Sequence, residues 1–390
     1  MDKVRLGVIG AGGSMASAHQ KNLADIEGVE YVAASDVDTD RLREVAQQYG
    51  VEAFDHAQRM LDSGKIDAVL IACPHYDHPV YAQHALKRGI HVLVEKPVAV
   101  TAKAAEQTST VYEEARKQHP ELLYAAMFNQ RTRADWKMVK RLIDDGRVGE
   151  LMRVSWTITS WYRSQRYYDS GGWRATWAGE GGGVLLNQCP HNLDLFQWFV
   201  GMPSRVTAHV GLGKHHDIEV EDDVSALLEF PNGATGTFVT STSQSPGINR
   251  LEIVGDRATL IANADGKVTL RENVTPLSEF TPHTPERFGT PAVNTYDIDC
   301  GGGNPEHKGI LVNFINAIRH GEPLIAQAVD GIHGLELGNA MLMSGLTGQP
   351  VDIPTDRDAY ERLLKKLIDE STFEKKTVQE AGPADLSGTY

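Results

Sequence analysis

The chain has two parts that differ in their pattern of hydrophobic positions. Up to about residue 128, short apolar runs alternate with helix-like stretches. Near-continuous apolar runs are typical of parallel strands buried on both faces. We therefore predict a parallel sheet with helices on both sides. The expected strands are Val4–Ile9, Tyr31–Ser35, Val51–Phe54, Asp67–Ala72, His91–Val94 and Leu123–Phe128, and the expected helices are a stretch ending at Asp25, then Asp38–Tyr49, Asp77–Arg88 and Thr101–Gln118.

The pattern changes after about residue 129. Between Arg205 and Leu270, strand-like runs are separated by turn signals, and Pro231-Asn232-Gly233 predicts a hairpin of Val224–Phe230 with Ala234–Thr240. We expect an antiparallel sheet with one face free. Pro and Gly are frequent between Glu272 and Pro305 and no alternation holds, so we predict a loop there. The other expected elements are a strand over Leu151–Thr159 and helices over Ala134–Asp144, His307–Arg319 and Gly331–Ser344.

Charge and composition narrow the function classes. The chain has 390 residues, with 38 Lys and Arg against 52 Asp and Glu, a formal net charge of −14. So acidic a surface argues against binding to nucleic acid or anionic membranes. No apolar run reaches the roughly 18 residues of a transmembrane helix, and the first residues lack a signal-peptide layout. The three cysteines form no C-x-x-C pair, so we expect a cytoplasmic protein without disulfides or structural zinc.

A glycine-rich turn, Gly10-Ala11-Gly12-Gly13-Ser14-Met15-Ala16, follows the first expected strand. Gly10 would allow a tight turn, and Gly12 a close approach of the backbone to a pyrophosphate. The N-terminus of the next helix offers that phosphate free N–H groups and a positive dipole. Met15 replaces the third glycine of the dinucleotide pattern G-x-G-x-x-G. The expected cofactor contacts here are Gly10, Gly12, Gly13, Ser14 and Met15.

Asp36 ends the second expected strand. An acidic residue at this place binds the ribose 2′-hydroxyl of a dinucleotide. Because a carboxylate repels a 2′-phosphate, we expect NAD rather than NADP. The alternative is that Asp36 only caps the helix over Asp38–Tyr49.

Glu95-Lys96-Pro97 follows the fifth expected strand. Ligands of open α/β sheets bind at this carboxyl edge. Lys96 can there hydrogen-bond a substrate hydroxyl beside the nicotinamide; the alternative is an ordinary surface lysine.

A second group of polar residues lies in the second half of the segment Gly181–Asp194. Pro190 suits the first turn of a helix that continues to Val200. If Asn187 lies in that helix, it shares one face with His191 and Asp194. His191 could then accept a hydroxyl proton, oriented by Asp194 or Asn187. The alternative is a structural histidine.

Aromatic and basic residues are concentrated between residues 161 and 174. Such side chains suit sugar rings and hydroxyls, and we expect Arg163, Arg174 and Tyr168 to contact substrate. An aromatic-rich subunit contact is the alternative. The acidic and histidine-rich run His215–Asp223 lacks an ordered ligand spacing, so we expect a solvated loop and no metal site.

Together these motifs resemble the glucose-fructose oxidoreductase and inositol dehydrogenase superfamily, Gfo/Idh/MocA. The resemblance extends to about Pro354. The matching residues are Gly10–Ala16, Cys73-Pro74-His75-x-x-His78, Glu95-Lys96-Pro97, Phe128-Asn129-Gln130-Arg131 and Gly181–Asp194.

The resemblance implies an α/β Rossmann domain that binds NAD(P), over residues 1–128. It implies a substrate-binding and oligomerisation α+β domain with an open, mostly antiparallel sheet over 129–380; we expect 381–390 to be a disordered tail. It also implies a sugar or cyclitol substrate and a homodimer or homotetramer formed through the open sheet. Lys96 and His191 match the family's catalytic lysine and histidine, whereas Asn187 stands where the family often has Asp. The remaining expected cofactor contacts are Pro74, His75, His78, Glu95, Lys96 and Asn129.

The predicted activity is hydride transfer between NAD and a ring hydroxyl. Lys96 and Asn187 would hold that hydroxyl and His191 would remove its proton. Two alternatives stay open: an NAD-assisted glycosidase that oxidises its substrate transiently, and a non-catalytic NAD-binding regulator.

Overall fold

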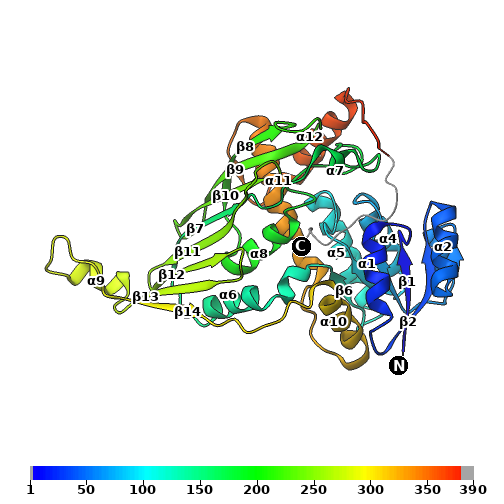
Figure 1. Cartoon of the computed structure of the whole chain (residues 1–390), viewed down its shortest axis with the longest axis horizontal. Helices are drawn as coiled ribbons and strands as arrows, with labels where there is room; N and C mark the ends of the chain where they lie inside the picture. Colours follow the sequence, from blue (N-terminus) through cyan, green and yellow to red (C-terminus); the bar gives the residue numbers. More distant parts are fainter. Residues whose placement is uncertain (1–2, 379–390) are drawn as a thin grey trace.

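The computed structural model describes residues 3–378, whose strands form two sheets (Figure 1). The expected tail, 381–390, lies outside the described residues. The strands of the first sheet are β1 Val4–Ile9, β2 Val29–Ser35, β3 Glu52–Phe54, β4 Ala68–Ile71, β5 His91–Val94 and β6 Tyr124–Ala126. Those of the second are β7 Leu151–Ile158, β8 Arg205–Leu212, β9 Glu221–Glu229, β10 Thr235–Ser241, β11 Asn249–Gly255, β12 Ala258–Asn263, β13 Val268–Asn273, β14 Val293–Ile298 and β15 Val351–Asp352.

Helices connect these strands and cover them. The α-helices are α1 Ser14–Leu23, α2 Thr39–Tyr49, α3 Ala57–Leu61, α4 Asp77–Leu86, α5 Ala102–Arg116, α6 Ala134–Asp144, α7 Gln165–Asp169, α8 Pro190–Val200, α9 Leu277–His283, α10 Glu306–His320, α11 Gly331–Thr347 and α12 Arg357–Glu370; the 3₁₀ turns are η1 Asn129–Thr132 and η2 Ala328–Asp330.

The first sheet is a doubly wound Rossmann sheet. Its strands are parallel and run in the order β3-β2-β1-β4-β5-β6. The central strands β4 and β5 are buried along their whole length, which explains their unbroken apolar sequences. The strand order reverses between β1 and β4, and ligands of such sheets bind outside the strand ends at this point. The predicted α/β domain is confirmed.

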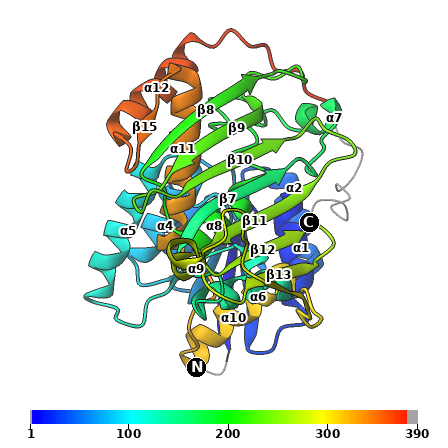
Figure 2. The same cartoon turned by 90° about the vertical axis from the view of Figure 1, so that its left-hand side faces the viewer.

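The second sheet is mixed and mostly antiparallel, in the order β14-β13-β12-β11-β7-β10-β9-β8-β15. Its β9–β10 hairpin is antiparallel as predicted, whereas β10 and β7 pair in parallel. Helices α6, α8 and α11 pack on its inner side, between the two sheets (Figure 1). Figure 2 looks onto the outer face of this sheet. On β9, exposed Ser225 and Leu227 alternate with buried Val224, Ala226 and Leu228, as expected for a strand with one free face. The predicted open sheet is therefore also confirmed.

The predicted loop between Glu272 and Pro305 was wrong. This stretch contains α9 and β14, and β14 pairs with β13 at the edge of the second sheet. The residues of α9 are not buried, and those of β14 are exposed except the last. Backbone hydrogen bonds can hold an edge strand without a buried face, so neither element leaves a hydrophobic period in the sequence.

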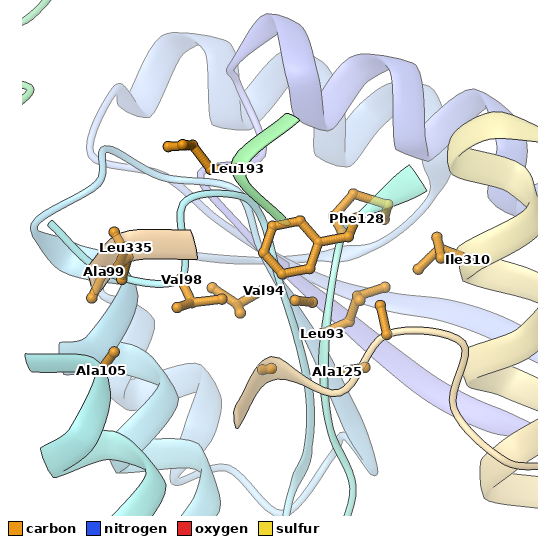
Figure 3. Close-up of a cluster of buried hydrophobic side chains, with 14 of the residues drawn as sticks. Leu93, Val94, Val98, Ala99, Ala105, Ala125, Phe128, Leu193, Ile310 and Leu335 are labelled. Atoms are coloured by element: carbon orange, nitrogen blue, oxygen red, sulfur yellow. The ribbon is translucent and has the colours of Figure 1, made fainter. Parts of the chain in front are cut away.

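Apolar side chains fill the junction between the two sheets. Phe128 directly precedes η1 and lies in a cluster with residues of both parts of the chain (Figure 3). The labelled neighbours include Leu93 and Val94 of β5, Ala125 of β6, Leu193 of α8, Ile310 of α10 and Leu335 of α11. The expected domain division after residue 128 thus falls inside a continuous core.

A buried ion pair crosses the same junction. Arg131 of η1 donates from Nε and Nη2 to the two carboxylate oxygens of Asp194 on α8, at 2.8 and 2.6 Å. The two side chains are only 4% and 1% exposed. This pairing holds α8 against the end of the first sheet.

Candidate active site

One cavity, with a volume of about 660 Å³, runs from the glycine turn to α8. Most of the site residues that we predicted from the sequence line this cavity. The predicted residues that line it are Gly10, Gly12, Gly13, Ser14, Met15, Asp36, Pro74, His75, His78, Glu95, Lys96, Arg163, Arg174, Asn187 and His191. It lies at the carboxyl edge of the first sheet, as the position of the motifs predicted.

The glycine turn has the geometry that a dinucleotide requires. Gly10 has a φ of +78°, and a Cβ atom on it would lie 2.6 Å from the carbonyl oxygen of Ala72. Any side chain here would therefore be both strained and blocked. Helix α1 begins at Ser14, so its first N–H groups face the cavity at the place expected for a pyrophosphate.

Asp36 stands beside this turn. Its Oδ2 accepts a hydrogen bond from the Gly12 N–H at 2.7 Å, and its Oδ1 accepts one from the Asp38 N–H at 2.8 Å. The cap of α2 is Asp38, which accepts from the N–H groups of Asp40 and Arg41. The alternative capping role of Asp36 is therefore wrong, and its carboxylate lines the cavity where a ribose would lie. The residues present fit NAD.

Lys96 connects the two parts of the chain. It follows β5, and its Nζ donates a hydrogen bond to the backbone oxygen of Asn187 at 2.8 Å. Burial lowers the pKa of Lys96, and the charge of Arg174 lowers it further, while Glu95 acts in the opposite direction. Lys96 is thus an ammonium group that loses its proton more easily than an exposed lysine.

Glu95 supplies a fixed negative charge next to Lys96. Its Oε1 lies 2.6 Å from Nε2 of His19, and its Oε2 accepts the Lys96 N–H at 3.0 Å. Burial alone would raise the pKa of Glu95, but the hydrogen bond and charge of His19 lower it to about 2. His19, which the sequence analysis did not single out, therefore keeps Glu95 ionised.

His191 lines the cavity from the first turn of α8. Neither of its ring nitrogens has a hydrogen-bond partner within the described residues. Burial and the nearby charge of Lys96 lower its pKa well below the ordinary value. His191 is therefore a neutral imidazole with a free lone pair, which is the state that a proton acceptor needs.

The expected partners of His191 are bound elsewhere. Helix α8 begins at Pro190, so Asn187 lies outside it and does not share its face with His191 and Asp194. Asp194 is paired with Arg131, and the side-chain amide of Asn187 donates to Glu180. The predicted orientation of His191 by Asp194 or Asn187 was therefore wrong.

Glu180 is a site residue that sequence reasoning missed. It is buried and accepts hydrogen bonds from the Ala175 N–H, at 2.6 Å, and from Asn187. Burial raises its pKa, and the charges of Arg174 and Lys96 partly offset this. Its carboxylate thus lies next to Asn187, the residue that stands where the family often has an acid. An acidic residue directly before three glycines was the available signal.

Two predicted contacts do not reach the cavity. Tyr168 is only 2% exposed, and its hydroxyl lies 2.7 Å from that of Thr242. It supports the wall from behind, while its neighbour Tyr167 lines the cavity in its place. Asn129, expected near the cofactor, is buried and is not among the residues that line the cavity. Neither placement was visible in the sequence, because no hydrophobic period exists there to separate inward from outward positions.

The segment after α12 also reaches the cavity. Thr377 and Val378 line the cavity, and the Val378 N–H donates to the backbone oxygen of Asp169 at 3.0 Å. Lys376 pairs with Asp217 at 2.5 Å. These contacts bring a remote part of the chain to the part of the cavity that Tyr167 and Ser170 line.

The run His215–Asp223 is more ordered than we expected. Asp222 is fully buried and accepts hydrogen bonds from the N–H groups of Lys214, His215 and His216. The expectation of a solvated loop was wrong at this residue. Within residues 3–378, no group of three or more His, Cys, Asp or Glu side chains is arranged to hold a metal ion. The helices in the same range are all too short or too polar to cross a membrane.

Known protein families match both parts of the chain. Residues 4–123 match an oxidoreductase family with an NAD-binding Rossmann fold, and residues 136–261 match the GFO/IDH/MocA C-terminal domain. The rhizopine catabolism protein MocA of Rhizobium meliloti is 30% identical over 255 residues, 63% of this chain and 74% of that protein. The chain belongs to the GFO/IDH/MocA family of oxidoreductases.

Further relatives agree with this family. Myo-inositol 2-dehydrogenase of Thermotoga maritima is 25% identical, over 86% of this chain and 95% of that enzyme. The WlbA dehydrogenase of Bordetella pertussis, solved with NADH and UDP-GlcNAcA, matches with a TM-score of 0.74 and 25% identity, over 91% of this chain and 100% of that one. The resemblance drawn from the motifs is confirmed, as are the NAD-binding Rossmann domain and the oxidoreductase class.

Proposed function

We propose that this protein is an NAD-dependent dehydrogenase that oxidises a ring hydroxyl of a sugar, cyclitol or related polyhydroxy compound. The observation that carries the proposal is that a lysine and a histidine lie in the same cavity as the expected cofactor site. The Lys96 ammonium and the neutral His191 imidazole both line this cavity, and no described residue is hydrogen-bonded to that imidazole. The glycine turn and Asp36 lie at the other end of the cavity. Relatives named as inositol and levoglucosan dehydrogenases support the substrate class.

The residues have separate roles in this proposal. NAD, held by the glycine turn and Asp36, supplies the hydride acceptor. Lys96 donates a hydrogen bond to the reacting hydroxyl oxygen, and the Asn187 amide orients a neighbouring hydroxyl. His191 accepts the hydroxyl proton as the carbinol C–H bond breaks. Glu95 and Glu180 keep Lys96 charged enough to act as a donor, since both lie near it.

Two alternatives predict different behaviour. An NAD-assisted glycosidase would cleave a glycoside with no net NAD reduction, and a non-catalytic regulator would bind NAD without turnover. A regulator has no need of a neutral histidine that is unpartnered within residues 3–378 and shares a cavity with a lysine. The geometry therefore favours an enzyme over a regulator, and net NAD reduction would separate the dehydrogenase from the glycosidase.

Replacing Lys96 should separate catalysis from cofactor binding. Lys96→Ala removes the hydroxyl donor but leaves the glycine turn intact, so kcat should fall by about 100-fold or more while NADH affinity changes little. Steady-state nicotinamide absorbance over inositols, aldoses, anhydrosugars and glycosides, with NADH fluorescence titration, measures both. Lys137→Ala, on the exposed face of α6, is the matched control. A parallel loss of NADH binding would contradict the role of Lys96.

The pH profile should report the lowered pKa of His191. The ordinary pKa of a histidine is 6.5, and that of His191 lies well below it, so His191 is still unprotonated at pH 6.5. The kcat/KM for oxidation should therefore fall only at a pH below 6.5. His191→Asn should abolish this acid limb and lower kcat by about 100-fold or more. His84→Asn, at a partly exposed pair with Asp62, should leave the profile unchanged. An acid limb at or above pH 6.5 in the unaltered enzyme would count against His191 as the base.

Asp36 should set the choice of NAD over NADP. Arg41 and Asp38 also line the cavity, and Arg41 donates to the backbone oxygen of Gly12 at 3.4 Å. Asp36 is the carboxylate that is bound to the glycine turn, through the Gly12 N–H, so it is the group that we expect to oppose a 2′-phosphate. Asp36→Ser should raise the NADP-to-NAD ratio of kcat/KM by about 10-fold or more, because like charges in contact cost several kcal/mol. Asp40→Ser, exposed on α2, should not. Equal use of both cofactors by the unaltered enzyme would refute the argument.

We further propose that the chain forms a homodimer or homotetramer through the outer face of the second sheet. Leu227 is 62% exposed whereas its chain neighbours Ala226 and Leu228 are buried, so strand alternation puts it on that face. Leu227→Glu should shift the sedimentation velocity profile toward one chain, and Val312→Glu on α10 should not. A single-chain mass for the unaltered protein would exclude this assembly.

A further inference from the structure

Two arginines share the cavity with the proposed catalytic pair. Arg163 and Arg174 both line it, together with Lys96 and His191. Both arginine charges act on Lys96 and lower its pKa, so they lie at the substrate end of the cavity. Three cationic groups therefore converge on the place where the substrate is expected.

Arg163 and Arg174 make few polar contacts within the described part of the chain. Within residues 3–378, no carboxylate lies at ion-pair distance from Arg163 or Arg174. Arg163 donates from Nη1 to the backbone oxygen of Tyr162 at 3.0 Å. The buried Nε of Arg163 has no hydrogen-bond partner among the described residues. Arg174 donates from Nη1 to the Tyr167 hydroxyl at 3.1 Å. A guanidinium carries five N–H donors, so most of these donors are unused.

The nearby carboxylates are committed to other groups. Glu95 is bound to His19 and to the Lys96 N–H. Glu180 is bound to the Ala175 N–H and to Asn187. They offset part of the positive charge of the cavity but do not occupy the arginine donors.

Both guanidinium groups are held in place before any ligand binds. Arg163 lies over the Tyr167 ring at 5.1 Å, and Arg174 lies over the Tyr167 and Trp173 rings at 4.9 and 4.6 Å. The backbone oxygen of Arg163 accepts a hydrogen bond from His216, which is paired with Asp222 at 2.8 Å. Such stacking leaves the guanidinium edges free and reduces the entropy lost on binding.

From this geometry we infer that the substrate of the proposed dehydrogenase is anionic: a polyhydroxy compound whose carboxylate or phosphate is bound by Arg163 and Arg174 while Lys96 and His191 act on a hydroxyl. The inference rests on the proposed function. A planar guanidinium binds either anion through two parallel hydrogen bonds. A neutral sugar would leave the free N–H donors of both arginines without an anionic acceptor.

Matched pairs of compounds test the inference. NAD reduction and isothermal titration to the NADH-loaded protein would be measured with D-glucuronate and D-galacturonate, against D-glucose and D-galactose. Glucose 6-phosphate is the phosphate arm. At least one anion should exceed its neutral parent in affinity or kcat/KM by about 10- to 100-fold, as expected for charge-assisted hydrogen bonds. A uronate preference identifies a carboxylate, and a preference for the phosphate ester identifies a phosphate.

Substitutions locate the effect. Arg163→Gln and Arg174→Gln should each raise KM for the preferred anion by about 10-fold or more, with little change for the neutral parent or for NADH. Arg166→Gln on α7, an exposed arginine that does not line the cavity, is the matched control.

The outcomes separate the two proposals. Neutral sugars that are oxidised or bound as well as every anion would overturn the anionic substrate and leave the dehydrogenase standing. Anion binding without NAD reduction by any compound would support the arginine site and contradict the dehydrogenase. Absence of anion binding, or an equal loss of NADH affinity in both arginine variants, would overturn the inference, since the arginines would then serve the cofactor.

Discussion

The pairing of Arg131 with Asp194 is the interaction on which the geometry of the active site depends. Each charge is buried and would be strongly destabilising alone; breaking such a pair by removing one partner costs about 3–5 kcal/mol. Arg131 follows the last strand of the Rossmann sheet, and Asp194 lies one helical turn after His191. Their pairing therefore sets the position of the proposed base relative to Lys96, although neither residue lines the cavity.

A consistent electrostatic arrangement surrounds this pair. The buried carboxylates Glu95, Glu180 and Asp194 each have a specific partner, in His19, Asn187 and Arg131. His191 has none within the described residues and is uncharged. Acids are thus fixed where they orient other groups, while the imidazole remains free to exchange a proton. This division of roles agrees with hydride transfer better than with a purely structural histidine.

The cofactor end of the cavity could be predicted from the sequence because its determinants are local. A strand, a glycine turn and the helix after it are adjacent in the chain, and Asp36 and Lys96 each end a strand of known direction. The substrate end could not be predicted in the same way. Tyr167 and Tyr168 are neighbours in the short helix α7, and only tertiary packing decides which of them faces inward. Glu180 and Val378 reach the cavity through contacts distant in sequence, which no periodic pattern records.

The two ends of the cavity also differ in how they are built. The cofactor end rests on strand termini of the buried sheet, where a substitution disturbs the core. The substrate end is formed by the stretch from Trp161 to Trp173, whose only helix is the short α7, and by Thr377 and Val378. An ion pair of Lys376 with Asp217 and a backbone hydrogen bond of Val378 attach the second of these segments. Loops of this kind tolerate replacement far better than strands. Evolution or a protein engineer can therefore retarget this chain to a new substrate while its redox chemistry and both of its sheets remain unchanged.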